Sequence, residues 1–167
     1  MMKRVLSLTL LLSGLLLALP ANAAKPPIGD RAPDFTLHSS GPYNLRLEEQ
    51  KGYVVVGVFW ASWCRSCPVE MQALERLRKK YSEMGVKIWA ITLDKKFDDA
   101  LHYAAQHHLH YVLLQDSDTK VSERYDIDDL PSTFVVDRNG KLRLQKEGFN
   151  PEDEATLDQF LQKLVHE

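Results

Sequence analysis

The two cysteines of this 167-residue chain, Cys64 and Cys67, are separated by two residues and preceded by Trp63. Two thiols at this spacing can close into a reversible disulfide and exchange with disulfides of other molecules. A purely structural disulfide is the weaker interpretation, because a four-residue loop stabilises a fold by only about 2 kcal/mol, against about 4.7 kcal/mol for a hundred-residue loop. A structural zinc site usually needs four ligands, and no second cysteine pair exists. The spacing therefore favours redox chemistry.

The pair lies between a predicted strand and a predicted helix. Residues 54–60 form a continuous apolar run rich in valine, which is typical of a central strand buried on both faces. Helical spacing of apolar residues predicts a helix over 64–84, and an apolar strand over 86–93 completes a strand–helix–strand unit. A helix N-terminus stabilises a thiolate and lowers the pKa of a cysteine there. We expect Cys64, at the helix tip, to be the exposed nucleophile and Cys67 to be the buried resolving thiol.

The N-terminus resembles a secretory signal peptide over residues 1–23. Lys3 and Arg4 precede an apolar stretch over 5–19, and small residues follow at 21–23. The apolar stretch is shorter than the roughly 20 residues of a spanning helix, so an uncleaved anchor is the second choice. Cleavage would leave 144 residues (167 minus 23) and move the net charge from −2 to −4. We therefore expect a periplasmic protein with no nucleic-acid-binding surface.

The remaining pattern predicts one α/β domain over 34–167, joined to the signal peptide by a linker over 24–33. An Asn-Gly pair at 139–140 favours a β-hairpin. Asn150 is predicted to cap the last helix, with Pro151 in its first position. The other predicted elements are two short strands over 34–37 and 43–47, a helix over 97–108, a strand over 112–114, a short helix over 119–125 and the hairpin strands over 133–136 and 141–145.

Segment 59–67, Phe-Trp-Ala-Ser-Trp-Cys-Arg-Ser-Cys, resembles the active-site segment of the thioredoxin superfamily. Segment 130–134, Leu-Pro-Ser-Thr-Phe, resembles the cis-proline loop of that superfamily. The opening segment 29–35 and the sequence Cys-Pro-Val-Glu at 67–70 are similar to the exported TlpA/ResA-like thiol-disulfide oxidoreductases. The resemblance covers essentially the whole mature chain. It implies a thioredoxin fold, with a central mixed β-sheet flanked by helices and a short N-terminal β extension.

The resemblance also implies roles for individual residues. Pro131 would be the cis proline beside the dithiol, and the backbone of Leu130 would pair with an extended substrate, with Trp63 at the edge of the site. The acid that thioredoxins carry six residues before the first cysteine is replaced by Val58. Glu70, one helical turn after Cys67, is therefore the expected proton relay. The alternatives are an ordinary strand-leading proline and a solvated acid on a helix surface.

Some positions depart from the family pattern. The residues between the cysteines, Arg65 and Ser66, are not the pair common among relatives, so the redox potential is not carried over. Pro68 costs an early helical hydrogen bond if the helix is already regular there. Trp60 is expected to pack in the core. The histidines are expected to lie at a helix end and turn rather than in a metal site, and they are His102, His107, His108 and His110.

The sequence as a whole predicts a periplasmic thiol-disulfide oxidoreductase, more a reductase than an oxidant, that acts as a monomer. It would reduce exported proteins that carry disulfides, without nucleotide, flavin or metal, and the resemblance implies a membrane thiol donor for its re-reduction. The alternatives are a disulfide oxidant of the same fold and a non-catalytic redox-sensing binding module or chaperone. A peroxidase is a weaker alternative because its Thr-X-X-Cys pattern is absent.

Overall fold

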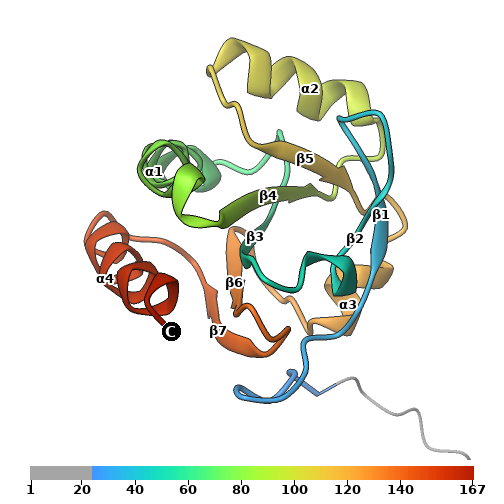
Figure 1. The fold of residues 1–167 in the computed structure, drawn as a ribbon. Helices are drawn as coiled ribbons and strands as arrows, with labels where there is room; N and C mark the ends of the chain where they lie inside the picture. Colours follow the sequence, from blue (N-terminus) through green and yellow to red (C-terminus); the bar gives the residue numbers. More distant parts are fainter. Residues whose placement is uncertain (1–23) are drawn as a thin grey trace, which may run out of the picture.

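The computed structural model describes residues 24–167, so the predicted signal peptide lies outside the described residues. Within them, strands form one mixed sheet in the order β2-β1-β5-β4-β3-β6-β7 (Figure 1). Strands β3, β4 and β5 are parallel, and β1, β6 and β7 each run antiparallel to a neighbour. The strands are β1 (Thr36–Ser39), β2 (Leu45–Arg46), β3 (Val54–Trp60), β4 (Val86–Thr92), β5 (Val112–Gln115), β6 (Ser132–Val136) and β7 (Leu142–Glu147).

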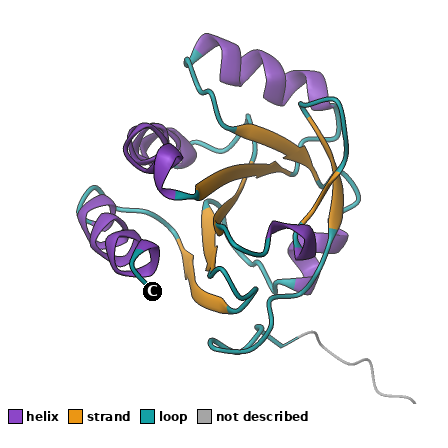
Figure 2. Ribbon diagram, viewed as in Figure 1, coloured by secondary structure: helices purple, strands orange, loops and turns teal. Residues whose placement is uncertain are grey.

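Helices cover both faces of this sheet, which confirms the predicted fold class (Figure 2). The helices are α1 (Cys67–Tyr81), α2 (Phe97–Gln106), α3 (Lys120–Arg124) and α4 (Asp153–Val165), with 3₁₀ turns η1 (Glu48–Gln50) and η2 (Ser82–Met84). All seven residues of β3 are buried, as its apolar run predicts. Its alternate side chains enter two cores. Val56 and Trp60 pack with α1, α2 and α4, whereas Val55 and Phe59 pack with α3 and the N-terminal segment.

Gly57, at the centre of β3, permits a close approach of an aromatic ring. A Cβ atom added at this position would lie 2.1 Å from Cζ of Phe134 on the neighbouring strand β6. The Phe134 ring is fully buried and packs against the rings of Phe35, Phe59 and Tyr125. The glycine therefore lets this aromatic cluster lie directly on the central strand.

Two helices begin later than the sequence predicts. Helix α1 starts at Cys67, so Cys64 lies in the turn before it, and Pro68 falls in the first turn. The first four N–H groups of a helix have no intrahelical partner, so Pro68 costs no helical hydrogen bond there. Helix α4 starts at Asp153 and has no side-chain cap. Asn150 instead forms a turn, in which its carbonyl accepts from the Asp153 N–H at 2.9 Å.

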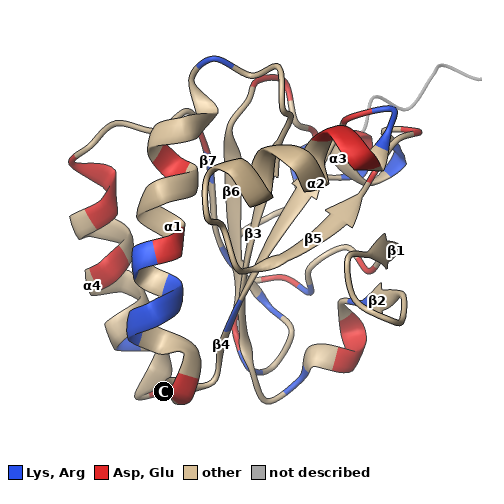
Figure 3. Ribbon diagram, turned by 90° about the horizontal axis from the view of Figure 1, so that it is seen from above, with Lys and Arg blue, Asp and Glu red and all other residues tan. Residues whose placement is uncertain are grey.

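Helices α1 and α4 lie side by side and are joined by opposite charges (Figure 3). Arg76 and Lys80 of α1 pair with Glu154 and Asp158 of α4 at 2.6 and 2.7 Å. These pairs are largely exposed, so each contributes at most about 1 kcal/mol. The α1–α4 packing therefore depends mainly on the apolar core beneath.

The N-terminal end of the described chain contacts the β6–β7 hairpin. The Gly29 N–H donates to the Leu142 carbonyl at 2.7 Å, the Leu142 N–H donates to the Asp30 carbonyl at 2.9 Å, and the Ala32 N–H donates to the Gly140 carbonyl at 3.0 Å. Backbone pairing therefore begins within the segment predicted as a linker, 24–33. None of the helices in residues 24–167 has the length and apolar character that crossing a membrane requires.

Candidate active site

The two cysteines form a disulfide, with a sulfur–sulfur distance of 2.05 Å, at the junction between β3 and α1. Cys64 lies in a turn closed by its own N–H, which donates to the Ala61 carbonyl at 3.0 Å. Its exposed fraction is 8%, and that of Cys67 is 0%. Cys64 is thus not the freely exposed thiol that the sequence predicts, although it is the more accessible of the two. The α1 N-terminus next to the pair provides the partial positive charge that favours a thiolate.

A buried carboxylate holds the turn before Cys64 in place. Asp94, just beyond the end of β4, accepts hydrogen bonds from the Ser62 N–H at 2.9 Å and the Ser62 hydroxyl at 2.8 Å. The Thr92 hydroxyl donates to it at 2.6 Å. Buried carboxylates need such donors, so Asp94 fastens the cysteine turn to the neighbouring strand. Sequence reasoning missed Asp94, whose only signal is an acid directly after a buried parallel strand.

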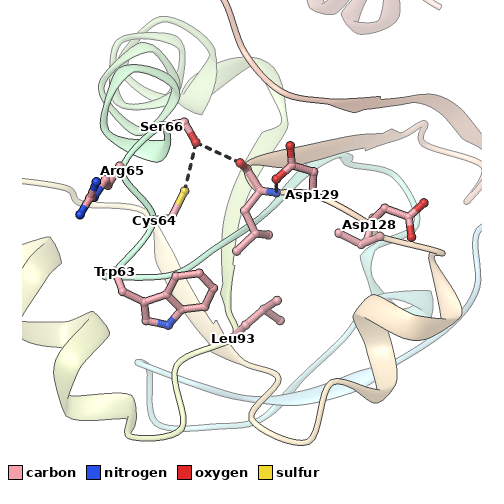
Figure 4. Close-up of a pocket in the computed structure, with 9 residues that line it drawn as sticks. Trp63, Cys64, Arg65, Ser66, Leu93, Asp128 and Asp129 are labelled. Carbon is pink, nitrogen blue, oxygen red and sulfur yellow. Dashed lines mark hydrogen bonds between the residues drawn. The ribbon is translucent and has the colours of Figure 1, made fainter.

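The loop before β6 lies opposite the cysteines, as the family resemblance implied. The Leu130–Pro131 peptide bond is cis, which confirms that prediction, and Pro131 is buried. The Leu130 carbonyl accepts from the Ser66 hydroxyl at 3.0 Å, and Ser66 Oγ lies 3.5 Å from Cys64 Sγ (Figure 4). The Leu130 N–H donates to Asp129 Oδ1 at 2.8 Å. Residues 64 positions apart in sequence therefore meet at one site.

An open groove of about 460 Å³ runs past Cys64 between these two segments. Trp63 forms part of its edge and is 66% exposed (Figure 4). The groove is open rather than enclosed, so it would not surround a small molecule as ligand cavities usually do. Sequence reasoning placed Trp63, Cys64 and Leu130 here. It did not place the other lining residues here, which come from the cysteine turn and two separate loops: Arg65, Ser66, Leu93, Ile127, Asp128 and Asp129.

Glu70 is buried inside the molecule, with an exposed fraction of 2%. The Thr133 hydroxyl donates to its Oε1 atom, and its Oε2 atom has no hydrogen-bond partner among the described residues. Burial raises the pKa of Glu70 to about 7, against a smaller opposing effect of the Thr133 hydrogen bond. The alternative of a solvated helix-surface acid is therefore wrong. A carboxyl group with a pKa near neutrality can both accept and donate protons under physiological conditions.

The remaining candidates lie away from this site. Trp60 is fully buried and packs against Tyr103, as expected for a core residue. His107 stacks on the same Tyr103 ring, and His110 contacts Glu75 at 3.2 Å. His108 lies just beyond α2 with a positive φ of 54°. In the part of the chain that the structure describes, no group of three or more His, Cys, Asp or Glu side chains is arranged to hold a metal ion.

Comparison with known proteins points to one class of protein. The AhpC/TSA family model matches residues 28–145. A thiol-disulfide oxidoreductase ResA of Bacillus cereus is 30% identical over 145 residues, which cover 87% of this chain and 83% of that protein. The ResA protein of Bacillus subtilis (strain 168) is 27% identical over 114 residues, covering 68% of this chain and 64% of that protein.

Solved structures agree with this fold. A candidate thiol:disulfide interchange protein DsbE from Chlorobium tepidum has a TM-score of 0.79 and 33% identity, and the match covers 83% of this chain and 98% of that one. The thioredoxin domain of a thiol-disulfide oxidoreductase from Bacteroides vulgatus has a TM-score of 0.74 at 22% identity, covering 84% and 99% of the two chains. The second likeness supports the fold alone.

Proposed function

The chain belongs to the AhpC/TSA family of thioredoxin-like proteins, and from that premise we propose that it reduces disulfides of exported proteins. Its relatives are named thiol-disulfide oxidoreductases. The observation that carries the proposal is the Cys64–Cys67 disulfide beside an open groove, with Cys64 as the more accessible sulfur. The groove brings an incoming disulfide to the sulfur that can attack it.

The reaction starts from the reduced protein and proceeds by two exchanges. The Cys64 thiolate attacks one sulfur of the substrate disulfide, so that a Cys64–substrate bond forms and the substrate bond breaks. The leaving substrate thiolate takes a proton. Cys67, as thiolate, then attacks Cys64, forms the intramolecular disulfide and releases the second substrate thiolate, which is also protonated. Two electrons pass from the protein to the substrate, and the protein ends as the disulfide seen here.

Glu70 supplies the proton chemistry of the second exchange. It lies on α1 one turn after Cys67, and its pKa of about 7 allows it to take up the proton that the Cys67 thiol loses. Its location away from the groove keeps this carboxylate from repelling the attacking thiolate. Glu70→Gln should therefore slow release of the mixed disulfide and alter the pH profile of turnover.

We propose the periplasm as the site of action, because an oxidising compartment supplies protein disulfides. The electrons then come from a membrane thiol donor that restores the dithiol after each turnover. Redox potential separates a reductase from an oxidant, since thioredoxin lies near about −270 mV and the oxidant DsbA near about −120 mV. Equilibration of the protein with glutathione buffers measures this potential, and a value near that of DsbA would reverse the proposed direction.

A trapping experiment tests the order of attack. Cys67→Ser leaves Cys64 able to attack but removes the resolving thiol, so mixed disulfides with exported proteins should accumulate. Non-reducing gels and mass spectrometry of periplasmic extracts detect them. The matched control is Cys64→Ser, which should trap few partners because Cys67 is fully buried. Equal trapping by both variants would show that Cys64 is not the nucleophile.

A further inference from the structure

Ser66 occupies the N-cap position of α1, but its hydroxyl does not cap the helix. A serine at this position usually accepts a hydrogen bond from an N–H of the first helical turn. Here the hydroxyl donates to the Leu130 carbonyl at 3.0 Å, and its oxygen lies 3.5 Å from the sulfur of Cys64 (Figure 4). The side chain therefore connects the reactive sulfur with the loop across the groove.

The hydroxyl cannot donate to both neighbours at once. A serine hydroxyl carries one hydrogen and two lone pairs. A protonated Cys64 could donate to Ser66 Oγ while the hydroxyl still donates to Leu130. A Cys64 thiolate can only accept, and hydrogen bonds to ionised acceptors are stronger than those between neutral groups. Ionisation of Cys64 therefore draws the Ser66 hydrogen away from the Leu130 carbonyl.

The Leu130 backbone is the place where an extended substrate can bind. Leu130 lines the groove and directly precedes β6, and the only partners of its N–H and carbonyl among residues 24–167 are the side chains of Asp129 and Ser66. A polypeptide lying in the groove can replace these partners with its own main-chain groups, as in strand addition. When a substrate N–H donates to the Leu130 carbonyl, that carbonyl keeps a hydrogen-bond donor. The free-energy cost of turning the Ser66 hydroxyl away from it is then smaller.

We propose that Ser66 is a positioning residue that couples docking of an extended polypeptide on Leu130 to activation of Cys64. The substrate N–H replaces the Ser66 hydroxyl as the hydrogen-bond donor to the Leu130 carbonyl. The Ser66 hydroxyl then turns and donates to the Cys64 sulfur, and the thiol proton leaves to solvent. The thiolate is then stabilised when a disulfide is in place to be attacked. The inference rests on the proposed function and names its substrate class: extended polypeptides that present a main-chain N–H beside their disulfide.

Coupling of this kind is reciprocal, so docking and ionisation must favour each other equally. A small aromatic disulfide without an N–H group cannot release the hydroxyl from Leu130. The two substrate types should therefore differ in how their reaction depends on pH, even when they carry the same leaving group. This difference separates the proposed coupling from a general effect of Ser66 on Cys64.

The test uses two probes with one leaving group. One is a synthetic peptide whose single cysteine carries a thionitrobenzoate disulfide, and the other is the symmetrical dithiobis-nitrobenzoate, which lacks N–H groups. Single-turnover rates of the reduced protein are measured against pH at low and at saturating probe concentration. These limits report the Cys64 pKa in the free and the bound protein. With the peptide, the Cys64 pKa of the bound protein should be lower than that of the free protein by about one pH unit, which is a tenfold gain in the thiolate-to-thiol ratio. With the small probe, the two values should coincide.

Two variants identify Ser66 as the cause. In Ser66→Ala the Cys64 pKa values measured with the peptide for the free and the bound protein should coincide, and both should be higher than in the wild type. Ser66→Thr keeps a hydroxyl and should restore the difference between the Cys64 pKa of the free protein and that of the peptide-bound protein. Ser66 is exposed, so alanine removes no buried contact, and circular dichroism checks the fold. A separation that persists in Ser66→Ala, or is absent from the wild type, overturns the inference.

Catalytic reduction of insulin by the wild-type protein tests the proposed function separately, because the pKa measurement needs only one turnover. A protein that fails with insulin but shows the Ser66-dependent separation would retain the inference and lose the reductase assignment. A protein that reduces insulin without the separation would retain the function and lose the inference.

Discussion

Two buried glutamates on α1 differ in their surroundings and therefore in their acidity. Glu70 accepts one hydrogen bond, from the Thr133 hydroxyl, and burial raises its pKa to about 7 although Thr133 and the nearby Lys146 act in the opposite direction. Burial also acts on Glu75, but hydrogen bonds from the Arg78 guanidinium and the His110 N–H outweigh it and hold its pKa below the usual 4.5. The same residue type on one helix is thus poised for proton transfer at one position and paired as an ion at the other.

The raised pKa of Glu70 predicts a loss of stability toward alkaline pH. The unfolded chain releases this proton near pH 4.5 and the folded chain near pH 7, so the free energy of unfolding falls as pH rises through that window. The full loss is roughly 3 kcal/mol. Glu70→Gln removes the titration, so the stability of the variant relative to wild type should rise between pH 5 and pH 8. Urea unfolding at a series of pH values measures this difference.

Glu75→Gln is the matched control, because its sign is opposite. The folded-state pKa of Glu75 lies below 4.5, so its contribution is present above that pH and is lost as pH falls through the folded value. The variant should be destabilised most near neutral pH, and the deficit should shrink on acidification. Parallel pH profiles for the two variants would contradict the assigned environments.

At the scale of elements, the strand pairing of β3 and β6 brings Gly57 against the Phe134 ring. The ring belongs to a fully buried aromatic cluster and has little room to move. Gly57→Ala should therefore destabilise the protein by about 1–3 kcal/mol through overpacking. Thermal or urea unfolding of the oxidised protein checks this value.

Gly41→Ala serves as the control for that substitution. Gly41 lies between β1 and β2, where an added Cβ would meet only the Ser39 hydroxyl oxygen at 3.4 Å. The free energy of unfolding of the Gly41→Ala variant should stay within about 0.5 kcal/mol of the wild type. An equally small effect of Gly57→Ala would mean that the Phe134 ring moves aside at low cost.

At the scale of the whole molecule, the start of the described chain is held against the β6–β7 hairpin. Backbone pairing reaches back to Gly29, close to the expected new N-terminus at Ala24. When the protein is expressed with its leader in a Gram-negative bacterium, the periplasmic fraction should contain it. Its intact mass should match residues 24–167.

The processing prediction has a direct control in the cleavage region. Replacing Ala21 and Ala23 by leucine removes the small residues that cleavage requires, so the variant should keep its leader and remain with the membranes. A wild-type protein recovered at full-chain mass would instead support the uncleaved anchor.

Local sequence pattern was sufficient for much of this protein. The apolar run of β3, the Asn-Gly hairpin and the motif at 64–67 each report on residues that are close along the chain. Helix starts were less well predicted. Helical spacing extended the first helix back to Cys64, whereas α1 begins at Cys67. Asn150 and Pro151 have the residue types of a helix start, whereas α4 begins at Asp153. Periodicity indicates which face a residue occupies but not where the first helical turn closes.

The sequence by itself determined that a reversible dithiol lies at a strand–helix junction, since strand burial, helix spacing and the two-residue separation are local properties. Only the tertiary structure decided what surrounds that dithiol. The burial of Glu70 beside Thr133 and the contact of Ser66 with Leu130 join residues more than 60 positions apart. Acidity and hydrogen bonding depend on such neighbours, which no local pattern names, because desolvation arises from packing of distant segments.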